Sequence, residues 1–259
     1  VPCRDPAWLG SERRTQPETG RKVRREHHME KEYCTAIVLA AGSGRRMGTK
    51  VHKQYLLMGG KPVLYYPIKA FQESELIDEI ILVTGTGEED YCRENIVDKY
   101  AFTKVRKIIA GGSERYASVW NGLQETDEDG YVFIHDGARP FVDQEMIRRA
   151  YECVREYKDC AAGVPAKDTI KIVDQREFVK DTPERSSLWL VQTPQVFESS
   201  LIKGAYSMLM REQYISVTDD AMAVEQMLNF PIKMYLGGYS NIKITTPEDL
   251  EIAEVFLKK

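Results

Sequence analysis

The chain has 259 residues, and 36 Lys and Arg against 40 Asp and Glu leave a net charge of −4. This length can bury a core without disulfides or metals, and the acidic balance disfavours sequence-independent binding to DNA or RNA, which needs a basic surface. The longest uncharged apolar stretch, 35–41, is far shorter than the roughly 20 residues that span a bilayer. We therefore expect a soluble protein without nucleic-acid or membrane partners.

The five cysteines are odd in number and never occur in a C-x-x-C spacing. This usage indicates neither a disulfide framework nor a zinc site. Reduced thiols in a cytoplasmic protein are the expected state.

Residues 1–32 differ in composition from the rest of the chain. They carry eight Lys and Arg, six Asp and Glu, few aliphatic side chains, and no apolar run that resembles a secretory signal. Such a segment cannot bury enough apolar area to offset the entropy lost on ordering. We predict a disordered leader or a cloning remnant here, with Met29 as a natural start, and a single domain over 33–259.

Short apolar runs and amphipathic stretches alternate after the leader. The runs 34–39, 79–84, 105–109 and 131–135 predict strands, and the stretches 62–73 and 114–125 predict helices, the first with Pro62 in its first turn. This alternation predicts an α/β fold with a doubly wound, mostly parallel sheet covered by helices on both faces. In such folds ligands bind at the carboxyl ends of the strands.

The stretch 161–193 interrupts this alternation. It contains four strand-like runs, 161–164, 169–173, 177–180 and 188–192, with turns at 174–176 and 181–183 and no predicted helix between them. We predict a projecting β-arm near 165–190, which a second subunit would cover because two strands alone are marginal in water. Helices at 199–211, 219–227 and 247–257 and a strand at 232–236 are predicted after it.

A loop rich in glycine and alanine follows the first strand, from Leu39 to Gly48. Its small residues let a backbone cradle of N–H groups approach a phosphate, and Arg46 and Lys53 add positive charge. The spacing G-x-G-x-x-x-G misses the dinucleotide fingerprint, which disfavours a nicotinamide oxidoreductase. The alternative interpretation is a glycine turn beside a solvated basic face.

Two further clusters follow predicted strands. Gly112, Ser113, Arg115 and Ser118 combine backbone donors, a helix start and a cation, although Ser113 as a simple N-cap is a second interpretation. Asp136 ends the next strand, where a carboxylate can bind Mg²⁺ or simply cap a turn. We expect its neighbour His135 to be a packed histidine.

Less specific groups lie further along the chain. The arm contains Lys167, Lys171 and Arg185, which taken separately are ordinary exposed charges, and Thr246 is predicted as the N-cap of the last helix. Several phosphate-directed clusters with one carboxylate and no nucleophile triad favour phosphoryl or nucleotidyl transfer.

Taken together, these motifs resemble the 2-C-methyl-D-erythritol 4-phosphate cytidylyltransferase family. They occur in the same order along the chain as in that family, and the resemblance covers nearly all of 33–259. The resemblance rests on the runs Ala40-Ala41-Gly42-x-Gly44-x-Arg46-Met47, Lys53-Gln54-Tyr55, Gly111-Gly112-x-Glu114-Arg115-x-x-Ser118, His135-Asp136-Gly137-Ala138-Arg139-Pro140, Asp168-Thr169-Ile170-Lys171, Glu184-Arg185-x-x-Leu188-Trp189, Gln192-Thr193-Pro194-Gln195 and Asn241-Ile242-Lys243-Ile244-Thr245. It implies a Rossmann-like nucleotidyltransferase that joins CTP and methylerythritol phosphate, releases pyrophosphate with the help of Mg²⁺, and serves the non-mevalonate route to isoprenoid precursors.

The resemblance also implies roles for individual residues. Arg46 and Lys53 would neutralise charge on the phosphates, and Arg185 and Lys243 would position the methylerythritol phosphate. The nucleotide would be held by Leu39, Ala40, Ala41, Gly42, Gly44, Gly112, Ser113, Arg115 and Ser118, and the polyol by Asp136, Arg139, Thr169, Thr193 and Thr218. Asp136 would be the metal ligand, and the arm would cross to the partner in a homodimer.

Two residues depart from the family pattern. His52 stands where proline is common before the Lys-Gln pair, and Ser240 stands where many members have aspartate, so no second carboxylate metal ligand is expected. The run Gly237-Gly238-Tyr239-Ser240 also occurs in ribitol-5-phosphate cytidylyltransferases. A ribitol-5-phosphate cytidylyltransferase is therefore the first alternative function, and a non-catalytic nucleotide-binding module is the second.

Overall fold

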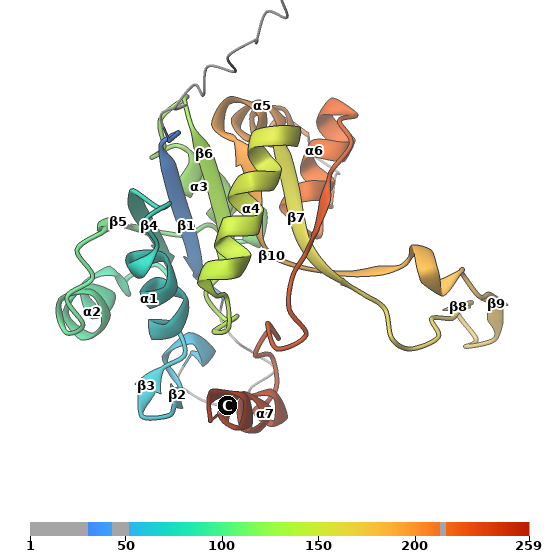
Figure 1. The fold of residues 1–259 in the computed structure, drawn as a ribbon, viewed down its shortest axis with the longest axis horizontal. Helices are drawn as coiled ribbons and strands as arrows, with labels where there is room; N and C mark the ends of the chain where they lie inside the picture. The colour runs from blue at the N-terminus through green and yellow to red at the C-terminus, as the bar shows by residue number, and fades with distance from the viewer. Residues whose placement is uncertain (1–30, 43–51, 213–215, 259) are drawn as a thin grey trace, which may run out of the picture. The chain divides into compact units, whose positions relative to one another are not determined.

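The computed structural model describes residues 31–42, 52–212 and 216–258, built around a seven-stranded sheet (Figure 1). The strand order is β11-β7-β10-β6-β1-β4-β5. Every neighbouring pair is parallel except those of β10, which runs antiparallel to both β6 and β7. The strands are β1 (Cys34–Ala40), β4 (Glu79–Thr84), β5 (Val105–Ala110), β6 (Tyr131–Asp136), β7 (Asp159–Pro165), β10 (Trp189–Glu198) and β11 (Met234–Leu236). The predicted α/β class with a mostly parallel sheet is confirmed.

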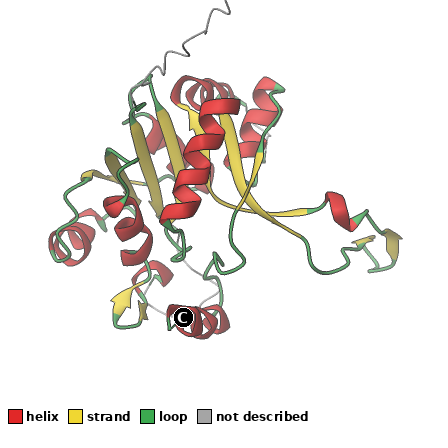
Figure 2. Cartoon of the chain, viewed as in Figure 1, coloured by secondary structure: helices red, strands yellow, loops and turns green. Residues whose placement is uncertain are grey.

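Helices pack on both faces of this sheet (Figure 2). One face carries α1 (Tyr65–Glu73) and α4 (Gln144–Tyr157), and the other carries α3 (Arg115–Leu123), α5 (Ser199–Leu209) and α6 (Asp220–Leu228). Along β1, Ala36 and Val38 belong to the core of the first face, whereas Ile37 belongs to the core of the second, and all three are fully buried. Burial on both faces is the reason that this strand is continuously apolar.

The order of the strands determines where a ligand can bind. The chain runs from β1 outward to β4 and β5 and then returns to β6 on the other side of β1. Leu39 of β1 pairs with Asp136 of β6, so these two strands end at the same level. A sheet that reverses its winding direction leaves a crevice at the carboxyl ends of the strands beside the reversal.

Two local predictions are wrong. Pro62 lies in the short strand β3 (Lys61–Pro62), which pairs with β2 (Leu57–Met58), so the first helix begins only at Tyr65. Ser113 is not an N-cap, because Glu114 occupies that position of α3 and no side chain caps the helix. Two helical segments were not predicted at all. One is α4, and the other consists of α2 (Glu89–Cys92) and the π-helical turn Arg93–Asp98 that follows it.

The arm is formed where β7 and β10 leave the sheet and continue together (Figure 1). Its tip is the hairpin of β8 (Ile172–Val173) and β9 (Val179–Asp181), shorter than predicted. No α-helix interrupts this stretch, as predicted, although a three-residue 3-10 turn spans Arg185–Ser187. Apolar side chains on the tip are exposed, Phe178 by 63%.

The boundary of the domain lies earlier than predicted. Lys31 pairs with Asp78, and the backbone N–H of Glu32 donates to the hydroxyl of Tyr151 at 3.3 Å, so these two residues belong to the domain. Residues 1–30 of the predicted leader lie outside the described residues. At the other end, α7 (Pro247–Leu257) starts at Thr246 with a capping box closed by Asp249, which confirms the predicted N-cap.

Among the described residues, 31–42, 52–212 and 216–258, no helix is long and apolar enough to cross a membrane. Among the described cysteines, Cys34, Cys92, Cys153 and Cys160 form no disulfide. Cys3 lies outside the part of the chain that the structure describes.

Candidate active site

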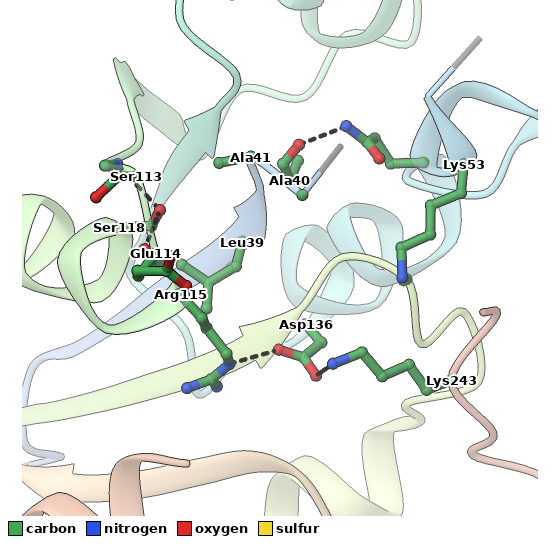
Figure 3. Close-up of a pocket in the computed structure, with 14 residues that line it drawn as sticks. Leu39, Ala40, Ala41, Lys53, Ser113, Glu114, Arg115, Ser118, Asp136 and Lys243 are labelled. Carbon is green, nitrogen blue, oxygen red and sulfur yellow. Dashed lines mark hydrogen bonds and ion pairs between the residues drawn. The ribbon is translucent and has the colours of Figure 1, made fainter. Parts of the chain in front are cut away.

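A cavity of about 400 Å³ opens at the carboxyl ends of β1 and β6 (Figure 3). This volume lies in the range of small-molecule sites. Its walls come from the end of β1, the turn Lys53–Tyr55, the loop before α3, the end of β6 and the segment before α7. The lining residues are Leu39, Ala40, Ala41, Gly42, Lys53, Gln54, Gly112, Ser113, Glu114, Arg115, Ser118, Asp136, Ala138 and Lys243. We call this space the first cavity.

The loop before α3 packs so closely that glycine is required. A Cβ on Gly111 would lie 2.4 Å from the Cβ of Ala41 and 2.7 Å from Oγ of Ser118. Ser118 Oγ accepts from the backbone N–H of Gly112 and donates to the carbonyl of Glu114, both at 3.1 Å. The loop is thereby held against the end of β1, and the N-terminus of α3 faces the first cavity, a favourable arrangement for an anion.

Two lysines from distant parts of the chain lie on one wall. Lys53 Nζ donates to the carbonyl of Ile244 at 3.0 Å, and the preceding residue is Lys243. The side chain of Gln54 donates to the carbonyl of Ala40 at 2.6 Å, which fixes the turn beside the end of β1. The segment before α7 therefore carries one cation and orients the other.

Asp136 lies among three cations. Its Oδ1 accepts from Arg115 Nε at 3.1 Å, its Oδ2 accepts from Lys243 Nζ at 2.7 Å, and Arg139 Nε lies 3.9 Å from Oδ2. Burial alone would raise the pKa of Asp136, but the charges of these neighbours, Arg115 first, hold it well below its usual range. The carboxylate is therefore ionised at any physiological pH.

A smaller cavity of about 230 Å³ adjoins the first and shares Arg115, Asp136 and Lys243 with it. We call it the second cavity. Its other lining residues are Arg139, Val191, Gln192, Thr193, Gln195, Thr218 and Asp219. Three of the residues predicted to bind the polyol, Arg139, Thr193 and Thr218, are thus brought together with Asp136.

The backbone and a buried histidine support this second cavity. The hydroxyl of Thr193 accepts from the N–H of Asp136 and contacts Nδ1 of His135, both at 3.1 Å. His135 is fully buried, with Nε2 3.0 Å from the carbonyl of Arg139, and burial lowers its pKa to about 4. It is a packed histidine, as predicted.

Two predicted site residues are not brought to the cavities of the same chain. Thr169 and Arg185 lie on the arm and line neither cavity, and Arg185 Nη1 donates to the carbonyl of Lys167 at 3.1 Å. Gly44 and Arg46 lie outside the described residues.

Sequence reasoning missed a buried network behind the cavities. Arg115 donates to both oxygens of Asp220 at 2.8 Å, and the hydroxyl of Tyr206 donates to Asp220 Oδ1 at 2.6 Å. Burial opposes the charge of Arg115, but the carboxylates of Asp220 and Asp136 raise its pKa well above its usual value. The pair Asp219-Asp220 signals only an acidic helix start, so nothing in the local pattern points to this role.

The match to known sequences covers the whole domain. A sequence model of the 2-C-methyl-D-erythritol 4-phosphate cytidylyltransferase family matches residues 34–259. A protein of that name from Lachnospira eligens is 54% identical over 225 residues, which is 86% of this chain and 99% of the relative. One from Caldanaerobacter subterraneus is 50% identical over 226 residues, covering 87% and 99%.

Solved structures agree with the sequence matches. The structure of 4-diphosphocytidyl-2C-methyl-D-erythritol synthase from Anaerococcus prevotii superimposes with a TM-score of 0.77 at 32% identity, over 89% of this chain and 100% of that one. The 2-C-methyl-D-erythritol 4-phosphate cytidylyltransferase of Thermus thermophilus gives a TM-score of 0.70 at 26% identity, over 86% and 98%. Sequence and fold thus agree with the resemblance carried by the motifs, and the chain belongs to the 2-C-methyl-D-erythritol 4-phosphate cytidylyltransferase family.

Proposed function

We propose that the first cavity binds CTP and the second binds 2-C-methyl-D-erythritol 4-phosphate, so that a cytidylyl group passes between them. The products are CDP-methylerythritol and pyrophosphate, for isoprenoid precursor synthesis. This assignment rests on one observation: the two cavities adjoin and share three lining residues, Arg115, Asp136 and Lys243. A nucleotide and a polyol phosphate bound on either side of these residues would meet at their phosphates.

The walls of the first cavity suit a nucleotide. Backbone groups of 39–42, Gly112 and Ser113, with Ser118 behind them, supply donors and acceptors without bulky side chains. Such groups hold phosphates and base edges without adding charge. Arg115 also lines this cavity, although its side chain is paired with carboxylates.

The transfer itself needs no protein nucleophile. An oxygen of the polyol phosphate attacks the α-phosphorus of CTP, and the bond to the β-phosphate oxygen breaks as pyrophosphate leaves. Lys53 and Lys243, on one wall, would stabilise the negative charge that develops on the phosphates, and we assign the same role to Arg46. Positioning and electrostatic stabilisation supply most of the catalysis in reactions of this class.

The second cavity suits a hydroxylated phosphate ester. Asp136 can accept from polyol hydroxyls, and Thr193 and Thr218 add hydroxyl groups beside it. The guanidinium of Arg139 is held by the carbonyl of Asn241 at 2.7 Å, and its Nε has no hydrogen-bond partner. We assign Thr169 and Arg185, which lie on the arm, to the polyol site of a second subunit.

Mg²⁺, which neutralises phosphate charge when bound, is proposed as the cofactor, with Asp136 as its protein ligand. Both oxygens of Asp136 accept hydrogen bonds from cations, and no cluster of three or more His, Cys, Asp or Glu suited to a metal occurs in 31–42, 52–212 and 216–258. This donor set fits a metal that takes most of its ligands from the phosphates of the nucleotide. The ammonium group of Lys243 would then release Asp136 and bind a substrate phosphate instead.

Pyrophosphate release tests the function. The protein is incubated with CTP and Mg²⁺ and with either methylerythritol phosphate or ribitol 5-phosphate. We expect release with the first acceptor and its loss when EDTA is added. Release with ribitol 5-phosphate alone would identify the alternative enzyme, and CTP binding without release would indicate a nucleotide-binding module.

We further propose a cytoplasmic homodimer in which the arms exchange. The exposed apolar residues of the arm support this assembly, because two short strands gain stability only when covered. If each site combines Lys243 of one chain with Arg185 of the other, mixed dimers of Lys243→Ala and Arg185→Ala contain one intact site. Mixing the two inactive variants should restore part of the activity, and no restoration would refute the exchange.

A further inference from the structure

Arg115 occupies an unusual place between the two cavities. Its backbone opens α3 over the first cavity, while its side chain reaches the end of β6 and the start of α6 (Figure 3). Three of its five N–H groups donate to carboxylates, one to Asp136 and two to Asp220. A cation engaged by two carboxylates attracts an additional phosphate less strongly than a singly paired lysine does.

Asp220 is built to hold this arginine. It is fully buried, it also accepts from the hydroxyl of Tyr206 at 2.6 Å, and it lies in the first turn of α6. Two parallel N–H···O bonds between a guanidinium and a carboxylate fix direction as well as distance. Lysine cannot reproduce this fork, because its ammonium group is a point donor on a flexible stem.

The start of α6 forms part of the wall of the second cavity. Gln195 accepts from the N–H groups of Asp220 and Ala221 at 3.0 and 2.9 Å, and its amide donates to Asp219 at 2.9 Å. Gln195, Asp219 and the preceding Thr218 all line that cavity. The ion pair of Arg115 and Asp220 therefore connects this wall to Asp136, which lines both cavities.

We propose that Arg115 and Asp220 are positioning residues for the acceptor: together they orient Asp136 and hold Thr218 for the polyol phosphate, and Arg115 is not a ligand of the CTP phosphates. This inference rests on the proposed function, and it changes the role that the sequence suggested for Arg115. With Oδ1 of Asp136 held by Arg115, Oδ2 is left facing Lys243 and the substrates.

Two conservative variants test the proposal. Arg115→Lys keeps the charge and removes the fork, and Asp220→Asn keeps the shape and removes the charge. For both we expect the KM for methylerythritol phosphate to rise by about tenfold, while the KM for CTP stays within twofold. Arg149→Lys is the matched control, because Arg149 also donates to a carboxylate and a carbonyl but lines neither cavity.

A binding measurement keeps the test independent of turnover. The rise in melting temperature that Mg²⁺ and CTP produce is compared for wild type and Arg115→Lys, each relative to its own unliganded protein. An equal rise supports the positioning role. A rise reduced by more than half, or a KM for CTP raised about tenfold, would make Arg115 a nucleotide ligand and overturn the proposal.

The kinetic result has an equally clear failure. If both KM values stay within twofold of wild type in Arg115→Lys and Asp220→Asn, the network is only structural and the proposal is wrong. An inactive wild type would instead contradict the proposed function, and the melting measurements would still decide whether Arg115 binds CTP.

Discussion

Lys243 offers a direct test of how the site works. The substitution Lys243→Gln keeps most of the stem and removes the ammonium group that donates to Asp136 at 2.7 Å. Losing one charge-stabilising donor in a transfer reaction costs about 3 to 4 kcal/mol of transition-state stabilisation, or about 10²- to 10³-fold in kcat/KM. Stability should fall by only about 1 kcal/mol or less, because the lysine side chain is 36% exposed.

The assay is pyrophosphate release with CTP and methylerythritol phosphate varied in turn, beside urea unfolding of the same preparations. Lys107→Gln is the control, since Lys107 forms a 2.8 Å ion pair with Glu125 at 42% exposure and lines neither cavity. Asp136 keeps Arg115 and Arg139 in the variant, so the fold should be maintained. Activity within threefold of wild type, or a stability loss large enough to explain the inactivity, would refute the reasoning.

Three other predictions follow from the packing. Gly111→Ala places a Cβ 2.4 Å from the Cβ of Ala41, so we expect the KM for CTP to rise at least tenfold. Gly204→Ala is the control: its Cβ meets nothing within 4 Å, so the KM for CTP should stay unchanged. Burial raises the pKa of Asp159 to about 6, above its unfolded value, so the stability of the wild type falls as pH rises from about 4 to 6. In urea unfolding at pH 7.5, Asp159→Asn should therefore be up to about 3 kcal/mol more stable than wild type. Near pH 4 the substitution should have no effect on stability. Tyr206→Phe removes a donor to buried Asp220 and should cost about 1 to 2 kcal/mol in the same assay; a neutral result would mean that this hydrogen bond contributes nothing net.

Much of the fold could be predicted because its signals are local. The central strands β1, β4 and β6 are buried on both faces, and the predicted range 79–84 is the observed β4. Thr246 caps α7 through a box of neighbouring residues, a pattern that depends on four positions only. The omitted helix α4 has its buried Met146, Ile147, Ala150, Tyr151 and Val154 at helical spacing, so its signal was present among many charged residues.

The site was predictable in its residue types and less so in its geometry. Small residues and charges that follow a strand or precede a helix are a signal that can be recognised in the sequence. This signal selected 39–42, Asp136, Lys53 and Lys243. Their grouping into one cavity depends on the strand order, which brings the ends of β1 and β6 to one level. The pairing of Arg115 with Asp220, 105 residues later, has no local signal.

The sequence by itself determined the fold class and the positions of most strands, and it suggested the candidate site residues, because burial periodicity, caps and glycine turns are encoded within short windows. Only the tertiary structure decided which charges meet: Arg115 is held by two carboxylates, Lys53 contacts the segment of Lys243, and Arg185 lines neither cavity of its own chain. The physical reason is that a charge acquires its role from the partners that folding brings near, and those partners are distant in the chain.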